Sequence, residues 1–440
     1  MVDMSLTWKD VTFNYILPDQ KKDRIIGLSF PENDLNLGLE PSILTVLPDG
    51  DNVEYSLKNI DFPDDDVRYY LCSVYIAGMD EFKAWANRHD KTKIIVGGYH
   101  PTTFPEEFKR YAAKIVVGPC DDIYATIAQS GQIVHGVTSY NHLPRYDLYD
   151  VRWNQQVIPD KLKEELCTSI STSQGCPFRC DFCCTPIMSN KLISKPLDLV
   201  TREIKFLHET YAKYGDLKYI FIRDENFPLQ KDWKERLAAI SAELPKVKIY
   251  LFASANTLDV ESIKYMAKHN VYMICLGLEN INKEYKKNEN LDNVIKLLKQ
   301  FKIYTYLSFI VDPLEIIGQE KGKEFYELLL TRLYTLKPEM ICGNFLMPFR
   351  GTKLWDKYYA YISEDDYKFY NSKSAFMIRN KVVRAKMEFF MWYYQMVYYN
   401  SSVYKHEVRN FNVDDTLAQR FDELKKMFTD RYNILWNKRG

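Results

Sequence analysis

Short apolar runs, separated by helical or turn-forming segments, fill the first third of the chain. Four of them are predicted to be strands, and they cover residues 42–47, 67–76, 93–96 and 114–117. Uninterrupted apolar runs that alternate with helices are typical of a parallel sheet buried on both faces. We therefore expect an α/β domain over residues 1–140, with any ligand at the carboxyl ends of its strands.

A second alternation begins at Cys167, after an irregular segment over residues 141–166 that we interpret as a linker. Its six predicted strands are residues 168–172, 219–224, 248–253, 271–278, 304–311 and 340–345. The helices predicted between them are residues 197–214, 231–244, 260–269, 292–301 and 320–336. Six β/α repeats are enough to curl a parallel sheet into a partial, TIM-like barrel over residues 167–355. We expect a helical, aromatic region over residues 356–440.

Composition narrows the class of protein. Lys plus Arg and Asp plus Glu number 59 each, so the net charge gives no support for nucleic-acid binding. No apolar run reaches the length of a membrane span, and the first residues lack the apolar core of a signal peptide. The nine cysteines do not have the spacing of a small disulfide framework. We expect a reduced, cytoplasmic protein in which clustered cysteines bind metal.

Three cysteines on one loop carry the clearest chemical signal. Cys176, Cys180 and Cys183 are separated by three and two residues, just after the first strand of the second alternation. Thiolates are the usual ligands of iron–sulfur clusters, and three of them leave one iron of a 4Fe–4S cube open. A structural zinc site is the alternative, but it needs four ligands, and Cys184 adjoins Cys183 too closely to complete it well. The spacing favours a catalytic cluster.

The cysteine spacing, with Phe182 before the third cysteine, resembles the signature of the radical S-adenosylmethionine (SAM) superfamily. The resemblance implies that SAM binds the open iron and is cleaved to a 5′-deoxyadenosyl radical. An external one-electron reductant, such as a flavodoxin or ferredoxin, is implied as well. SAM contacts are implied for Phe182 and for residues at later strand ends, namely Asp224, Glu225, Ser254, Asn256 and Glu279. Capping of a helix or strand end is the plainer interpretation of Asp224 and Glu279.

The N-terminal segment resembles the cobalamin-binding domain that precedes many radical SAM domains, chiefly over residues 94–102 and 116–118. The resemblance implies cobalamin contacts at Gly97, Gly98 and Gly118, where glycine lets a bulky ligand approach the backbone. The Asp-x-His-x-x-Gly element, whose histidine ligates cobalt in many such domains, is absent. We do not assign that role to His100. A Rossmann-like domain that has lost its cofactor and shapes the substrate channel is the alternative.

Together these resemblances imply a cobalamin-dependent radical SAM enzyme that methylates an unactivated carbon of a small-molecule or peptide substrate. The first alternative is a radical SAM enzyme that rearranges, cyclises or oxidises its substrate, with a vestigial N-terminal domain. A methylthiotransferase with a second cluster on Cys72, Cys120 and Cys167 is another. The last is a scaffold in which the cluster is only structural.

Overall fold

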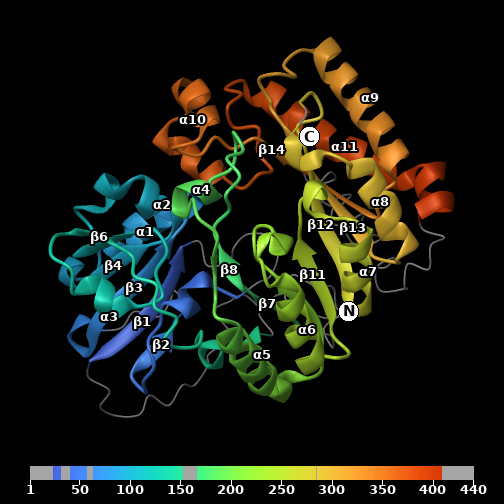
Figure 1. Ribbon diagram of the computed structural model, residues 1–440. Helices are drawn as coiled ribbons and strands as arrows, with labels where there is room; N and C mark the ends of the chain where they lie inside the picture. The colour runs from blue at the N-terminus through green and yellow to red at the C-terminus, as the bar shows by residue number, and fades with distance from the viewer. Residues whose placement is uncertain (1–22, 31–39, 57–62, 152–165, 284, 409–440) are drawn as a thin grey trace, which may run out of the picture.

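Two parallel sheets of six strands each lie side by side in the computed structural model, and the C-terminal helices lie along one side of both (Figure 1). The structure describes residues 23–30, 40–56, 63–151, 166–283 and 285–408. The linker residues 152–165 and the first 22 residues fall outside these ranges. Within the described ranges, none of the helices has the length and apolarity needed to cross a membrane.

The N-terminal sheet has the strand order β2-β1-β3-β4-β5-β6. Its strands are β1 (Arg24–Phe30), β2 (Val53–Tyr55), β3 (Val67–Val74), β4 (Ile94–Gly97), β5 (Lys114–Val117) and β6 (Ile133–His135). The helices α1 (Met79–Ala86), α2 (Tyr99–Thr103) and α3 (Ile123–Ile127) connect them. The strands predicted at 67–76, 93–96 and 114–117 are confirmed as β3, β4 and β5. β2 and β6 have three residues each, which leaves little pattern to read.

The strand predicted at residues 42–47 is wrong, because residues Ser42–Thr45 form a 3-10 turn, η1. Ile43, Leu44 and Leu47 are all buried in the core. Their spacing of one, three and four residues brings them to one face of a helical turn, whereas a strand would separate them onto two faces. The parallel sheet is instead completed by β1, whose seven residues are all buried.

The second sheet is the predicted partial barrel, with the order β14-β13-β12-β11-β10-β7. Its strands are β7 (Leu166–Ile170), β10 (Leu217–Ile222), β11 (Lys248–Phe252), β12 (Val271–Glu279), β13 (Tyr304–Val311) and β14 (Met340–Phe345). Its helices are α5 (Leu197–Tyr211), α6 (Trp233–Glu243), α7 (Val260–Lys268), α8 (Leu291–Gln300) and α9 (Gln319–Leu336). Every pairing is parallel, so all six carboxyl ends open toward the same rim. The predicted α/β fold class is confirmed.

The C-terminal region contains α10 (Lys353–Tyr358) and the long aromatic helix α11 (Lys381–Asn400). α11 covers the exposed edge of the barrel at β14. The hydroxyl of Tyr399 accepts a hydrogen bond from the Ile341 N–H at 2.8 Å, and the Gln395 amide oxygen accepts one from the Gly343 N–H at 3.0 Å. An edge strand with free N–H groups invites pairing with another chain, so α11 protects this edge.

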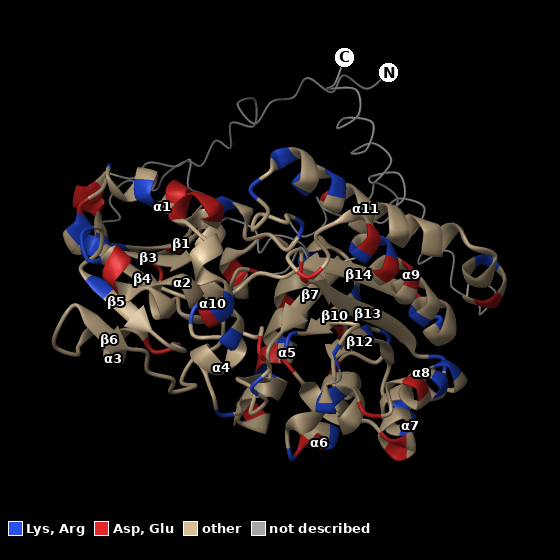
Figure 2. Cartoon of the chain, turned by 90° about the horizontal axis from the view of Figure 1, so that it is seen from above, with Lys and Arg blue, Asp and Glu red and all other residues tan. Residues whose placement is uncertain are grey.

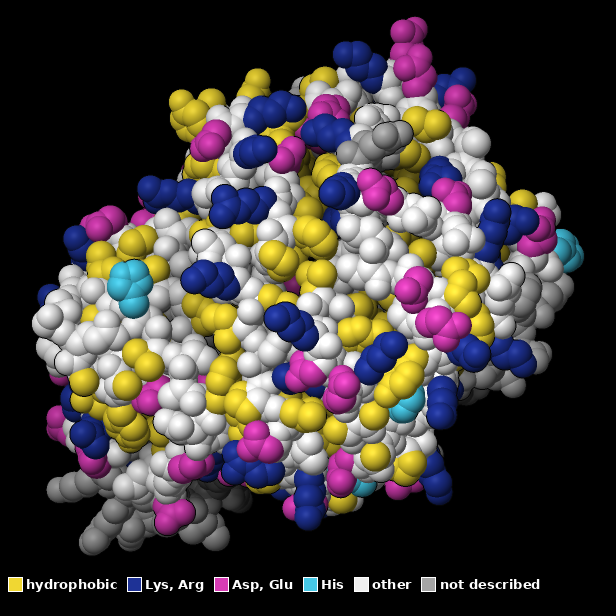
Figure 3. All heavy atoms as spheres, in the orientation of Figure 1, with side chains coloured by type: hydrophobic (Ala, Val, Ile, Leu, Met, Phe, Trp, Pro, Cys, Tyr) yellow, Lys and Arg dark blue, Asp and Glu magenta, His cyan; other side chains and the backbone are white. Residues whose placement is uncertain are grey.

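One apolar core runs from the N-terminal sheet into the barrel, because Leu71 and Ile95 belong to the same buried cluster as Ile170 and Ile220. The linker strengthens the junction, since the Tyr146 hydroxyl donates to Glu203 of α5 at 2.8 Å. Hydrophobic side chains gather along the seam between the two halves (Figure 3). Acidic and basic residues are interspersed over the helices of both halves (Figure 2). Strand ends of both halves line one cavity, so the two rims face a shared interior.

Candidate active site at the junction of the two sheets

The three-cysteine loop follows β7 and the short strand β8 (Ser173–Gln174) at the barrel rim. Gly175 has a φ of +84°, and a Cβ there would lie 2.7 Å from the Ser189 hydroxyl and closer still to the Lys191 carbonyl oxygen. Only glycine fits this position, because the backbone is left-handed and the facing segment is in contact. The loop then turns so that the Cys183 N–H donates to the Cys180 carbonyl oxygen at 3.1 Å.

The three thiols lie close enough to act on one another electrostatically. Burial raises the pKa of Cys176, and the Cys183 and Glu225 charges raise it further. Burial also raises the pKa of Cys180; Lys287 acts in the opposite direction, and the charges of Cys176 and Cys183 add to the rise. Among the described residues, no three His, Cys, Asp or Glu side chains surround a position for a single ion. A cube binds each thiolate through a different iron. The thiols of this loop, of which Cys176 is buried and Cys180 and Cys183 are partly accessible, are grouped as three ligands of a 4Fe–4S cluster would be.

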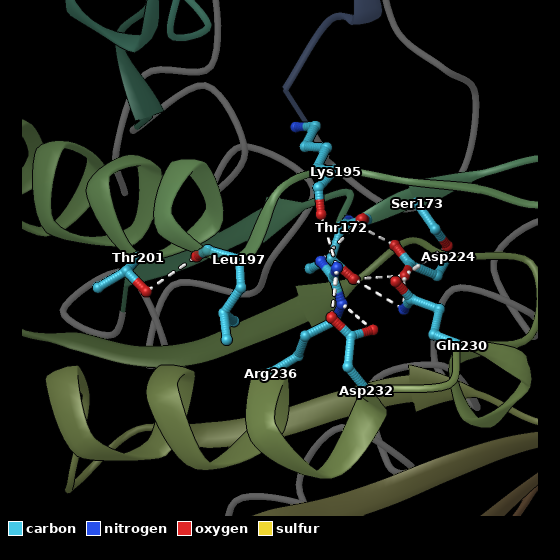
Figure 4. Close-up of polar contacts among 9 residues, drawn as sticks. All are labelled: Thr172, Ser173, Lys195, Leu197, Thr201, Asp224, Gln230, Asp232 and Arg236. Atoms are coloured by element: carbon cyan, nitrogen blue, oxygen red, sulfur yellow. Dashed lines mark hydrogen bonds and ion pairs between the residues drawn. The ribbon is translucent and has the colours of Figure 1, made fainter.

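Asp224 holds the base of the cysteine loop (Figure 4). Its carboxylate accepts hydrogen bonds from the Thr172 N–H, the hydroxyls of Thr172 and Ser173, and the Gln230 amide, at 2.6–2.8 Å. The side chain is fully buried. Burial raises its pKa, and the hydrogen bonds from Thr172 and Ser173 oppose that rise. The sequence placed Asp224 among the SAM contacts, but the structure turns it inward, where it positions the strand end that leads to Cys176.

The next residue, Glu225, points the other way. It is exposed and lines the large cavity at the junction. Partial burial in the cavity wall raises the pKa of its carboxyl, and the neighbouring Asp224 raises it further, whereas backbone hydrogen bonds from Glu225 itself and Gly175 lower it in part. Glu225 lies in the turn that follows β10, and this turn places the two neighbouring acids in different environments.

Ser254 and Asn256 follow β11, as predicted. Asn226 orients Ser254, because its amide donates to the Ser254 hydroxyl at 2.7 Å and its carbonyl accepts from the Ser254 N–H at 3.2 Å. Asn256 is exposed at the same rim. Both side chains remain accessible at the carboxyl end of the sheet.

Glu279, at the end of β12, forms an ion pair with Lys287. Glu279 has a positive φ of 60°, which directs its buried side chain back toward the rim. The Lys287 ammonium lies 5.3 Å from the centre of the Phe182 ring. Burial lowers the pKa of Lys287, but Glu279 and the Cys180 thiol outweigh that effect and raise it overall. Lys287 was not predicted from the sequence; it lies on the short 3-10 helix η12 (Lys286–Asn288) between β12 and α8.

A cavity of about 750 Å³ lies between the two sheets. Gly97, Gly98 and Gly118 line one wall, and Gly175 and Glu225 line the opposite wall. Gly98 and Gly118 have positive φ values of 99° and 85°, so side chains are disfavoured there and the wall stays flat. The volume is within the range of cofactor sites. These features suit a bulky planar cofactor such as a corrinoid.

The cysteine loop also contacts the N-terminal domain directly. α2 lies against the short helix α4 (Thr185–Met188), which follows the loop. Tyr99 lines the cavity, and burial together with the nearby Cys184 thiol raises its pKa strongly. His100 is fully buried and contacts Glu107 at 3.1 Å, so it faces away from the cavity. No histidine is among the described residues that line it.

The three cysteines considered for a second cluster do not meet. Cys72 and Cys120 line the cavity, from β3 and from the loop after β5. Cys167 lies on β7 and is not among the lining residues.

Comparisons with known proteins agree with this geometry. Residues 170–311 match the family model of the radical SAM superfamily, which spans the cysteine loop and the strand ends through β13. A radical SAM methyltransferase, TsrM from Kitasatospora setae, solved with cobalamin and a 4Fe–4S cluster bound, has a similar fold. Its TM-score is 0.55 at 15% identity, covering 76% of this chain and 78% of that one.

Two curated relatives are methyltransferases of Chlorobaculum tepidum. Bacteriochlorophyllide d C-8(2)-methyltransferase is 23% identical over 358 residues, covering 71% of this chain and 74% of the relative. Bacteriochlorophyllide d C-12(1)-methyltransferase is 21% identical over 294 residues, covering 61% and 63%. The chain thus spans less than two thirds of the second relative. Residues 170–311 of the chain are similar to radical SAM domains, and the protein is an enzyme related in sequence to known methyltransferases.

Proposed function

We propose that the protein transfers a methyl group from SAM to an unactivated carbon, using a 4Fe–4S cluster and a corrinoid. The observation that carries this proposal is the large cavity, which is bounded by Gly97 and Gly98 on one side and by Gly175 and Glu225 on the other. A cofactor in it would lie beside the cysteine loop. When bound, the reduced cluster supplies the electron that splits SAM, and a corrinoid supplies a carrier for the methyl group.

The chain's own residues have separate tasks in this proposal. Cys176, Cys180 and Cys183 hold three irons of the cluster. Asp224 keeps the loop in place through its buried hydrogen bonds. Glu225 is accessible, and its carboxylate form is suited to accept hydrogen bonds from the SAM ammonium group.

The remaining rim residues bind and orient SAM. Lys287 offers a positive charge between Glu279 and the cysteine loop, where it can pair with the SAM carboxylate. Ser254, held by Asn226, and Asn256 provide hydroxyl and amide groups for the ribose. Phe182 and the aromatic ring of Tyr285, which meet edge to face at 5.9 Å, limit access of water to this side. An external one-electron reductant completes the requirements.

The proposal is tested with anaerobically reconstituted protein, reductant, cob(I)alamin and SAM that carries a deuterated methyl group. We expect S-adenosylhomocysteine with deuterated methylcobalamin, and separately 5′-deoxyadenosine. Cys180→Ala should abolish formation of 5′-deoxyadenosine. Cys167→Ala, a thiol of similar exposure on β7, is the matched control and should keep it.

Two results would count against the proposal. If 5′-deoxyadenosine forms without S-adenosylhomocysteine or methylcobalamin, the non-methylating radical SAM enzyme is favoured. If neither product forms while the cluster is intact, the assignment of SAM to the rim is wrong.

A further inference from the structure

A second, smaller chamber of about 230 Å³ lies where the linker meets the barrel. Its walls come from segments far apart in the sequence: Tyr140 at the end of the N-terminal domain, His142 of the linker, Gln174 of β8, Lys195 before α5, and Arg223 just after β10. No function discussed so far uses it. Ser42, Thr45 and Gln174 line both this chamber and the large cavity, so the two spaces adjoin.

Four buried polar atoms at this chamber have no hydrogen-bond partner among the described residues. They are the Tyr140 hydroxyl oxygen, His142 Nε2, Gln174 Oε1 and Arg223 Nε. Buried polar atoms of native proteins are almost always hydrogen-bonded. Four unsatisfied atoms around one chamber therefore indicate that something polar binds in it.

The acids near the chamber are already satisfied. Asp121 accepts the N–H groups of Ser139 and Tyr140 at 2.7 and 3.0 Å. Glu203 accepts from the Tyr146 hydroxyl and from the Lys195 ammonium at 2.8 and 2.7 Å.

Of the four unsatisfied atoms, Arg223 Nε–H donates, the Tyr140 hydroxyl and His142 Nε2 can donate, and Gln174 Oε1 accepts. The Arg223 guanidinium donates to the Glu40 carbonyl oxygen at 3.1 Å through one nitrogen, which leaves the Nε–H free. Burial and the nearby Asp121 raise the pKa of Tyr140 to about 12, so its hydroxyl keeps its proton and donates. A ligand rich in acceptor oxygens and carrying negative charge matches these groups.

The backbone at Tyr140 supports a binding role. Tyr140 has a φ of +54°, a left-handed conformation that a tyrosine rarely adopts. Asp121 holds this turn through its two backbone hydrogen bonds. Strained residues persist where the surrounding structure enforces them, and they cluster at ligand sites. Here the strain brings the Tyr140 hydroxyl into the chamber.

We propose that this chamber binds a phosphoryl group through Arg223, Tyr140 and His142. Two sources share this chemistry. One is the phosphodiester of the nucleotide arm of a corrinoid in the adjoining cavity, which rests on the function proposed above. The other is a separate phosphate or phosphate ester.

The test compares the full-length protein with Tyr140→Phe, which removes one hydroxyl, and with Arg223→Gln. The matched control is Tyr326→Phe, because the Tyr326 hydroxyl is also buried and unpartnered but lies on α9. Binding is measured for hydroxocobalamin, for cobinamide, which lacks the nucleotide arm and its phosphate, and for inorganic phosphate. Thermal unfolding of each variant checks that it is folded.

If the corrinoid arm is the source, Tyr140→Phe should weaken hydroxocobalamin binding about tenfold and leave cobinamide binding unchanged. Arg223→Gln should weaken it further. If a separate phosphate is the source, wild-type protein should bind inorganic phosphate, and both variants should lose that binding.

The proposal is overturned if folded Tyr140→Phe and Arg223→Gln bind all three probes as wild type does, because the chamber then holds only water. A wild-type protein that binds no corrinoid contradicts the proposed function instead. In that case the phosphate measurement alone decides the role of the chamber.

Discussion

Replacing Gly175 with alanine should prevent cluster assembly while leaving most of the protein folded. Gly175 immediately precedes Cys176 and has a φ of +84°. An added Cβ would lie 2.7 Å from the Ser189 hydroxyl and 2.9 Å from the Ser189 Cβ, and closer still to the Lys191 carbonyl oxygen. The clash with a backbone carbonyl cannot be relieved by turning a side chain. The cysteine loop and the facing segment must therefore move apart.

The size of the effect follows from two contributions. A left-handed alanine costs about 1–2 kcal/mol. Overpacking against fixed backbone adds about 1–3 kcal/mol, and it requires a shift on the order of 1 Å. Bound metal tolerates ligand distances only within about 0.2 Å of their ideal values. We therefore expect a loss of about 2–5 kcal/mol in local stability, together with failure to hold the Cys176 thiolate on its iron.

The assay is iron and sulfide content after anaerobic reconstitution, with electron paramagnetic resonance of the reduced protein. Gly131→Ala is the control, because Gly131 has a similar φ of +90° but its nearest contact would be an ordinary 3.7 Å. It should lose about 1–2 kcal/mol in stability and keep its cluster. A Gly175→Ala protein with full iron and sulfide content would refute the reasoning.

Three further changes separate structural from binding roles. Asp224→Asn should lower the free energy of unfolding in urea by about 2–4 kcal/mol, because the new amide NH2 would face buried donors. Asp292→Asn is the control, since Asp292 forms a partly exposed ion pair, and it should lower that free energy by at most about 1 kcal/mol. The hydrogen bond from Arg236 lowers the pKa of Asp232, so its stabilising contribution should be present at neutral pH and be lost as pH falls below about 3.9. Unfolding curves of Asp232→Asn and wild type should therefore converge at acid pH; a difference that persists there would contradict this. Lys287→Met should weaken SAM binding about tenfold in equilibrium dialysis without loss of iron, and unchanged affinity would remove Lys287 from the SAM site.

The barrel was predictable because each of its strands is a compact apolar run bounded by turn residues. β13 and β14 have the predicted bounds, 304–311 and 340–345. The structure of the region around Ser42 was not predictable. Its short run of Ile43, Leu44 and Leu47 fits a helical turn as well as a strand, and only packing decides between them. The grouping of Cys176, Cys180 and Cys183 was predictable from their spacing, and the structure brings their thiols within electrostatic reach of one another, whereas their role as cluster ligands stays a prediction.

The direction of side chains at the rim was less predictable. Asp224 and Glu225 adjoin, and the sequence does not say which acid turns inward. Hydrogen bonds from the Thr172 hydroxyl and the Gln230 amide hold the Asp224 carboxylate in its inward position. Lys287 reaches the site from the 3-10 helix η12, where it forms an ion pair with Glu279. Contacts of this kind exist only after the barrel has closed.

The most direct test of the central claim is the amount of corrinoid bound per chain. Protein produced with ample cobalamin is purified anaerobically and extracted, alongside Gly97→Leu and Gly97→Ala. Gly97 lines the cavity, and a Cβ there would make only ordinary contacts, the nearest at 3.6 Å to Val116, so leucine would fill the cavity without a backbone clash. We predict about one corrinoid per wild-type chain, retention in Gly97→Ala and loss in Gly97→Leu, with iron content unchanged in all three. Wild-type protein with an intact cluster and no corrinoid would contradict the account.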